Sequence, residues 1–277
     1  KWDGVPRLDT WLIDHMGAAD GPYERAVGAI VLIAAVRRVR QPGCKFDECL
    51  VLVGEEGIGK STTLRALGHP WFSDSLPLGA DPKVTVERTT NVWICESAEL
   101  VGNTPTKIGE IKAFLSRQED GPFRAAYARS TMNRPRQFVP IATTNDSVFL
   151  HSASGDRRFW PVEVYYARDD FSRDQLLAEA SVREAAGETI RLDAKLWDIA
   201  RAKQEAYRVE DPWEGKLKDL GAKVPLPEIW PILGLSATIA TSRDAQRLAA
   251  VMRKLGYVGA RKMEGGIRTT YYEKLHQ

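Results

Sequence analysis

Cysteine is scarce in this sequence, which has only Cys44, Cys49 and Cys95 among its 277 residues. Three is an odd number, their spacing lacks the close pairs of a zinc site, and two of them lie in or beside apolar strands. We therefore expect buried free thiols in a reducing cytoplasm rather than a disulfide framework.

Long apolar runs are absent as well. The longest, residues 26–36, is about half the length that spans a bilayer and ends in two arginines. No signal peptide, internal repeat or low-complexity tract is visible, although the chain begins with Lys1 rather than Met, which is compatible with a fragment. We expect a soluble cytoplasmic protein with no membrane contact.

Charge of one sign is not in excess overall, because the formal net charge is only +2. From Lys216 onward, however, eleven Lys or Arg residues face five Asp or Glu residues. With 43% hydrophobic and 27% charged residues, the chain is long enough for a substantial core and more than one domain. The C-terminal basic excess predicts a nucleic-acid surface there.

A glycine-rich segment at residues 54–61 is the most informative motif. It has the G-x-x-x-x-G-K-S pattern and stands between an apolar run suited to a buried strand, residues 49–53, and a helix opening at 61–67. This context favours a phosphate-binding loop over an ordinary glycine-rich turn. Lys60 is expected to reach the β and γ oxygens of ATP and Ser61 to bind Mg²⁺. The expected nucleotide-contacting set is Gly54, Glu55, Glu56, Gly57, Ile58, Gly59, Lys60, Ser61 and Thr62.

Strand and helix patterns alternate along the rest of the chain. Helical spacing covers much of residues 8–40, 106–117 and 172–208, and apolar strands are predicted at 91–95, 138–145 and 159–164, with an arginine-dotted hairpin at 121–136. The pattern predicts an α/β fold with a mostly parallel sheet. The expected divisions are an N-terminal helical region (1–44), an ATPase domain (45–210), a linker (211–223) and a small C-terminal domain (224–277).

The C-terminal domain has its own pattern. A short helix at 227–233, a longer one at 242–255 with Ala245, Leu248, Ala249 and Met252 as its apolar stripe, and a hairpin turning at 265–266 resemble a winged helix-turn-helix. Its basic residues are expected to contact DNA phosphates, against the alternative of a merely solvated charged face. They are Arg243, Arg247, Arg253, Lys254, Arg261, Lys262 and Arg268.

Polar residues at strand ends supply the other catalytic candidates. Glu96 is expected to cap the strand at 92–95 as the metal-binding acid, and Glu99 to share or take over the polarisation of water. Asn145 ends the next strand, where it is expected to sense the γ-phosphate. Arg157, beside Arg158, is a candidate arginine finger acting on a neighbouring subunit. A solvated acid, a turn asparagine and a surface arginine pair are the alternatives.

The loop at 54–61, the segments Trp-Ile-Cys-Glu-Ser-Ala-Glu and Ala-Thr-Thr-Asn, and Gly-Asp-Arg-Arg-Phe-Trp-Pro-Val together resemble the virulence-associated protein E family. These phage and mobile-element ATPases are similar to superfamily 3 helicases of the AAA+ class. The resemblance implies a ring, usually hexameric, that moves on DNA by ATP hydrolysis. It implies Lys60 and Ser61 as Walker A, Glu96 as Walker B, Asn145 as sensor 1 and Arg157 as the finger, and it makes Arg129 and Arg134 pore-hairpin candidates.

One departure from the AAA+ pattern is Ser97, which stands where many of these proteins have a second adjacent acid. We expect an ATP-dependent DNA helicase or replication-initiation ATPase. The alternative is a DNA-binding protein switched by ATP, without processive unwinding. A GTPase is disfavoured because no Asn-Lys-x-Asp element is present, and a small-molecule kinase stays open.

Overall fold

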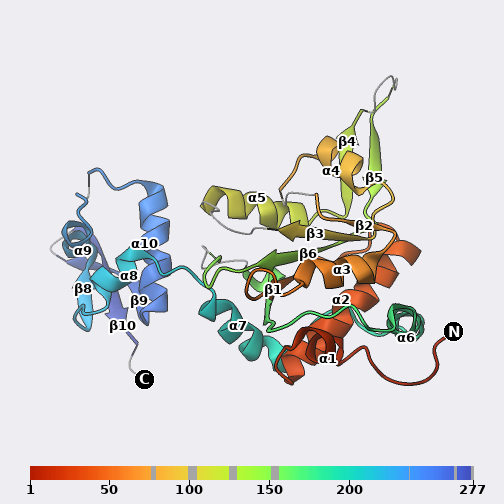
Figure 1. Ribbon diagram of the computed structural model, residues 1–277. Coiled ribbons are helices and arrows are strands. Elements are labelled where there is room, and N and C mark those ends of the chain that lie inside the picture. The colour runs from red at the N-terminus through yellow and green to blue at the C-terminus, as the bar shows by residue number, and fades with distance from the viewer. Residues whose placement is uncertain are drawn as a thin grey trace. The chain divides into compact units, whose positions relative to one another are not determined.

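The computed structural model describes residues 1–75, 79–98, 105–124, 130–150, 156–236, 238–264 and 267–275. The chain divides into two compact units, Lys1–Arg208 and Val209–Gln277. Figure 1 labels their helices and strands. Each unit has a hydrophobic core of its own.

The first unit is built on a parallel five-stranded sheet. Its strands run in the order β2 (Phe72–Ser73), β3 (Ile94–Ala98), β6 (Val139–Thr144), β1 (Cys49–Val53) and β7 (Phe159–Glu163). The α/β class and the parallel sheet predicted from the sequence are confirmed. Strand β6 lies between β1 and β3, so the strand that precedes the glycine-rich loop and the strand that contains Glu96 are not direct neighbours.

Helices cover both faces of this sheet, as period-two alternation along β1 requires. Leu50 and Leu52 face a core shared with α1 (Trp11–Met16), α2 (Pro22–Arg40), α3 (Lys60–Gly68) and α6 (Arg173–Ala185). Cys49, Val51 and Val53 face α5 (Pro105–Leu115) on the other side. Figure 1 shows this division, with α5 above the sheet and α1, α2 and α3 below it.

The N-terminal helices belong to the same core, which corrects the expectation of a separate region at 1–44. Trp11 and Leu12 of α1 and Ile33 of α2 are buried in one cluster with sheet residues such as Leu50. Helix α2 is apolar on nearly all sides, and such a helix needs cover on every side. The sheet supplies one side of that cover, and α1 and α6 also pack against α2.

Further elements surround the sheet. They are α4 (Pro82–Thr89), which the sequence analysis did not predict, the expected hairpin of β4 (Glu119–Phe123) and β5 (Met132–Pro135), the 3₁₀ helices η1 (Asp156–Arg158) and η2 (Ala194–Leu196), and α7 (Trp197–Ala206). Helix α4 packs against β4. Asp81 caps α4 by accepting hydrogen bonds from the backbone N–H groups of Lys83 and Val84.

The second unit contains α8 (Pro212–Leu217), β8 (Lys223–Pro225), α9 (Leu226–Ile232), α10 (Ser242–Lys254), β9 (Tyr257–Glu264) and β10 (Ile267–Lys274). Its strands form an antiparallel sheet in the order β8-β10-β9. In the stripe expected on α10, Leu248 and Met252 are buried, whereas Ala245 is exposed and Val251 packs inside instead.

The stretch expected as a linker, residues 211–223, is part of this unit. Helix α8 places Trp213 and Leu217 in the core with Leu248, so the chain divides near residue 208. The composition of 211–223 is polar apart from these anchors, and that polarity misled the prediction.

None of the three cysteines forms a disulfide. Cys49 and Cys95 are buried, as expected, whereas Cys44 is partly exposed. Across the described residues, we find no helix with the length and apolarity that a membrane crossing requires.

Candidate nucleotide-binding site

The loop between β1 and α3 is held closely against its neighbours, and two of its glycines are needed for that. The Gly54 N–H donates to the Thr144 carbonyl at 3.1 Å. A Cβ at Gly54 would lie 2.3 Å from the Val164 carbonyl oxygen. Gly59, which begins α3, has φ of +96°, a conformation that only glycine adopts readily. The loop backbone is therefore fixed from both sides at the N-terminus of a helix.

The side chain of Lys60 lies against this loop. Its Nζ donates hydrogen bonds of 2.7 Å to the carbonyls of Gly54 and Glu55. Desolvation lowers the pKa of Lys60, and the negative charges of Glu96 and Glu56 oppose that effect. The ammonium thus lies in a partly desolvated position at the loop, with Glu96 close enough to affect its charge.

Glu96 lies beneath the start of α3 and is 1% exposed. Its Oε1 accepts hydrogen bonds from Ser61 Oγ at 2.6 Å and from Thr143 Oγ1 at 2.7 Å. Its Oε2 is buried and has no hydrogen-bond partner among the described residues. The sequence placed Glu96 at the end of its strand, but β3 continues to Ala98, so the carboxylate lies inside the sheet layer. Glu99 lies outside the described residues.

The Ser61 hydroxyl and the Glu96 carboxylate fit a magnesium ion. Mg²⁺ prefers oxygen ligands and usually keeps several waters and substrate phosphates rather than a full protein cage. One carboxylate with an unpartnered oxygen beside one hydroxyl would supply a few ligands and leave the other coordination positions of the ion to water and phosphate. No cluster of three or more His, Cys, Asp or Glu side chains that could hold a metal occurs in the described part of the chain.

Asn145 is at the same end of the sheet. It directly follows β6, whose last residue, Thr144, accepts the hydrogen bond from Gly54, and Asn145 is exposed. Thr143 was missed by the sequence analysis. The signal was available, because residues two apart on a strand share a face, so the side chain two positions before Asn145 was a natural candidate.

Arg157 is at the opposite end. Strand β7 pairs in parallel with β1 in the register Cys49 with Phe159 and Val53 with Glu163, and Arg157 precedes Phe159. From Phe159 to Val164, beside the glycine-rich loop, the chain advances about 16 Å at 3.3 Å per residue. Arg157 is exposed and cannot reach the loop of its own chain.

The arginines expected in the pore hairpin have different environments. Arg134 donates to Thr90 Oγ1 at 2.8 Å and is partly exposed, while Arg129 lies outside the described residues. Arg136, which the sequence analysis did not single out, is buried at the base of the hairpin. It forms a two-pronged ion pair with Asp120 at 2.8 and 2.6 Å and donates to the Phe114 carbonyl at 2.6 Å.

Two of the basic side chains expected to contact DNA are engaged within the second unit. Arg247 pairs with Asp211 at 2.7 Å and lies 4.1 Å over the Trp213 ring, and this hydrogen bonding to Asp211 raises the pKa of Arg247. Lys254 pairs with Glu214 at 2.8 Å. Each of these contacts ties α10 to the segment containing α8, and the expectation that Arg247 and Lys254 contact DNA phosphates stays a prediction.

The other basic residues of the second unit are less engaged or not described. Arg253 donates to the Ala249 carbonyl of its own helix, and Arg261 is exposed on β9. The side chains of Arg243, Lys262 and Arg268 lie outside the described ones.

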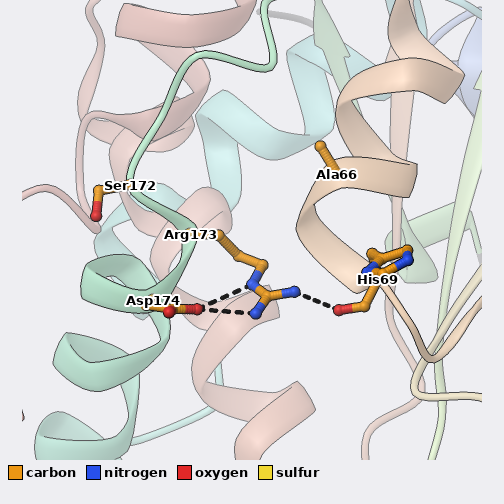
Figure 2. Close-up of a pocket in the computed structure, with 5 residues that line it drawn as sticks. All are labelled: Ala66, His69, Ser172, Arg173 and Asp174. Atoms are coloured by element: carbon orange, nitrogen blue, oxygen red, sulfur yellow. Dashed lines mark hydrogen bonds and ion pairs between the residues drawn. The ribbon is translucent and has the colours of Figure 1, made fainter.

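A broad hollow of about 470 Å³ lies at the other end of α3. Figure 2 shows Arg173 reaching across it, with hydrogen bonds to Asp174 and to the His69 carbonyl. Ala66 and Ser172 complete its lining. At 1.5 Å per residue, α3 separates His69 from Lys60 by about 13 Å. None of the candidate catalytic residues lines this hollow, so it is distinct from the glycine-rich loop.

Comparison with known proteins agrees with the motifs. Two solved apo structures of the C-terminal region of NrS-1, one of them described as its A form, are similar in fold, each with a TM-score of 0.50. They are 13% and 12% identical to this chain, and each match covers 99% of this chain and 77% of that one. No curated protein matches. A family model described as a virulence-associated protein E-like domain matches residues 1–209. The chain belongs to the virulence-associated protein E-like family.

Proposed function

We propose that this protein is a Mg²⁺-dependent ATPase that works as a ring on DNA during replication of a phage or mobile element, as a helicase or replication-initiation motor. The observation that carries the proposal is the contact of Ser61 with Glu96 under the glycine-rich loop. It brings a phosphate cradle, a metal-binding hydroxyl and a buried carboxylate to one helix N-terminus. Membership in the virulence-associated protein E-like family, which the motif resemblance links to phage and mobile-element ATPases, supports this setting.

The residues have separate roles in hydrolysis. The loop backbone and Lys60 would bind the phosphates, and Ser61 and Glu96 would hold Mg²⁺, which supplies a Lewis acid for the charge developing on the γ-phosphate. Asn145, at the same sheet end, would orient the attacking water. Lys60 already binds two loop carbonyls at 2.7 Å, so phosphate oxygens can take their place without a large movement.

A neighbouring subunit is needed to complete this site. The parallel register of β7 and β1 separates Arg157 from the loop of its own chain. An arginine finger at this position therefore acts only in trans, which favours a ring, with six subunits expected from the family resemblance. Its guanidinium would stabilise the charge of the transition state in the adjacent subunit.

Mixing two inactive variants tests the shared site. Lys60→Ala keeps Arg157 but loses its own phosphate contact, and Arg157→Ala keeps the loop but loses the finger. Each alone should show less than about 1% of wild-type hydrolysis, because an arginine finger contributes about 10³-fold or more. An equimolar mixture should recover a measurable fraction, since some interfaces join an intact loop to an intact finger. Arg157→Ala with wild-type turnover would refute the trans assignment.

The second unit supports DNA contact. Its helices α9 and α10 and the β9–β10 hairpin match the plan of a winged helix, and Arg261 on that hairpin is exposed. The alternative function, an ATP-switched DNA-binding protein, rests on the same unit. Unwinding of a forked duplex by wild type but not by Lys60→Ala favours the motor. ATP-dependent DNA binding without unwinding favours the switch.

A further inference from the structure

We infer that Thr143 is a positioning residue for Glu96: its hydroxyl fixes one oxygen of the carboxylate and leaves the other to act on the metal or on water. The inference rests on the proposed ATPase function. The sequence analysis assigned Thr143 no role. Its only described side-chain hydrogen bond goes to Glu96 Oε1, at 2.7 Å.

A buried glutamate needs such a partner because its terminal torsion is broad and roughly two-fold. Nothing in the bonding of the side chain itself decides which oxygen faces the site. Ser61 also binds Oε1, but its hydroxyl is the group expected to bind Mg²⁺, so that hydrogen bond changes when nucleotide enters. Of the two hydroxyls that donate to Oε1, that of Thr143 is not expected to bind Mg²⁺ and can keep its hydrogen bond.

The backbone of Thr143 is suited to holding the hydroxyl in place. Strand β6 lies in the interior of the sheet, and Thr143 is in register with Leu52 on one side and Ala98 on the other. Threonine is branched at Cβ, which restricts its first torsion. The side chain is 5% exposed, so water does not compete for the carboxylate. The hydroxyl is therefore a rigid reference point for Glu96.

The two carboxylate oxygens consequently have different tasks. Oε1 accepts from both hydroxyls, whereas Oε2 is buried without a partner in the described structure. An unpaired buried carboxylate oxygen is costly, so its retention calls for an explanation. In the proposed ATPase the explanation is that Oε2 accepts from metal-bound or attacking water. Thr143 ensures that this oxygen, and not Oε1, is the one available.

Three variants separate positioning from ordinary packing. Thr143→Val keeps the shape and removes the donor, and Thr143→Ser keeps the hydroxyl. Thr89→Val is the matched control, because Thr89 is also 5% exposed and donates a 2.7 Å bond, to the Thr85 carbonyl on α4. Thr143→Val and Thr89→Val each remove one buried hydrogen bond and should lose a similar amount of stability. In Thr143→Val the Oε1 atom of Glu96 still accepts the hydrogen bond from Ser61, so it is not left without a partner. A merely structural role for Thr143 thus predicts equal behaviour in every assay.

The measurements are steady-state hydrolysis and binding of a fluorescent ATP analogue, with EDTA and across a Mg²⁺ series. For Thr143→Val we expect kcat to fall by about 10- to 100-fold. The Mg²⁺ concentration that gives half-maximal binding of the analogue should rise by about 10-fold. Both are the usual effect of removing the hydrogen-bond partner of a metal ligand. The KM for ATP and the affinity in EDTA should change by less than about 2-fold. Thr143→Ser should return both quantities to near wild type.

Two kinds of failure are distinguishable. If wild type binds and hydrolyses ATP, Lys60→Ala does not, and Thr143→Val still matches Thr89→Val in kcat and Mg²⁺ dependence, the positioning role is refuted while the ATPase stands. If wild type and Lys60→Ala bind the analogue equally with Mg²⁺ present, the ATPase itself is wrong and the role of Thr143 falls with it.

Discussion

Asp120→Ala should be among the most destabilising single changes in the first unit. Asp120 and Arg136 form a bidentate ion pair whose side chains are 3% and 0% exposed. Removing the carboxylate leaves the guanidinium buried, and its remaining described contacts are the Phe114 carbonyl and two aromatic rings. A second buried guanidinium, Arg38, is near enough that burial and the charge of Arg136 lower the pKa of Arg38 to about 10.

The expected magnitude follows from this burial. Breaking a buried pair by removing one partner costs about 3–5 kcal/mol, because the remaining charge is desolvated without compensation. For a unit of this size, 1 kcal/mol moves the midpoint of thermal unfolding by roughly 2–4 °C, so the midpoint should fall by roughly 10 °C. Asp74→Ala is the control. Its pair with Arg65 is a single hydrogen bond of 2.7 Å, and the side chains are 53% and 60% exposed. Such a pair contributes about 0–1 kcal/mol.

Thermal and urea unfolding followed by circular dichroism would measure both variants, and the transition of the second unit serves as an internal reference. A double change, Asp120→Leu with Arg136→Met, should recover most of the lost stability, since replacing a buried pair by apolar groups is often neutral. If Asp120→Ala costs no more than Asp74→Ala, the buried pair does not fix the hairpin base and the argument from burial is wrong.

Two further changes have defined outcomes. Gly54→Ala should weaken ATP binding by at least about 10-fold and destabilise the first unit by about 1–3 kcal/mol, because the new Cβ would lie 2.3 Å from the Val164 carbonyl oxygen. Gly215→Ala, with open space around the same atom, should change neither quantity in isothermal titration and unfolding assays. Burial raises the pKa of Glu184, but hydrogen bonds from Arg40 and Arg37 outweigh it and hold the pKa below the ordinary 4.5. A pKa that is lower in the folded state than in the unfolded state stabilises the fold above the unfolded-state pKa, and this stability is lost as the pH falls through the folded-state pKa. Wild type should therefore lose stability below about pH 4.5. Glu184→Gln should make the free energy of unfolding less dependent on pH in this range.

The parts of the site that the sequence predicted are those set by local pattern. An apolar run of five residues, a glycine-rich turn and a helix opening lie next to each other in the chain, so β1, the loop and α3 follow from adjacent residues. Parallel strands then bring their carboxyl ends to one edge, which was enough to expect Asn145 beside the loop. No knowledge of distant contacts was needed.

The parts that sequence reasoning missed depend on contacts between distant residues. Glu96 was expected to cap the strand at 92–95, yet β3 continues to Ala98 by pairing with β6. The burial of Arg136 depends on Asp120, sixteen residues away, and on the carbonyl of Phe114. Residues 211–223 have the composition of a linker, and only the core of the second unit shows why Trp213 belongs inside.

The positions of Asn145 and Arg157 show how sheet topology decides which candidate residues can act in the same site of one chain. Both are polar residues at the border of a strand that pairs in parallel with β1. From the sequence, Asn145 was expected to sense the γ-phosphate and Arg157 to act on a neighbouring subunit. Asn145 follows β6 and Arg157 precedes β7, so parallel pairing sends them to opposite ends of the sheet. If both act in ATP hydrolysis, one subunit supplies Asn145 and its neighbour supplies Arg157. The specific activity of the wild-type protein should then rise with its concentration, because mass action must first bring the subunits together. Activity that is independent of concentration down to the nanomolar range would leave Arg157 without a catalytic role.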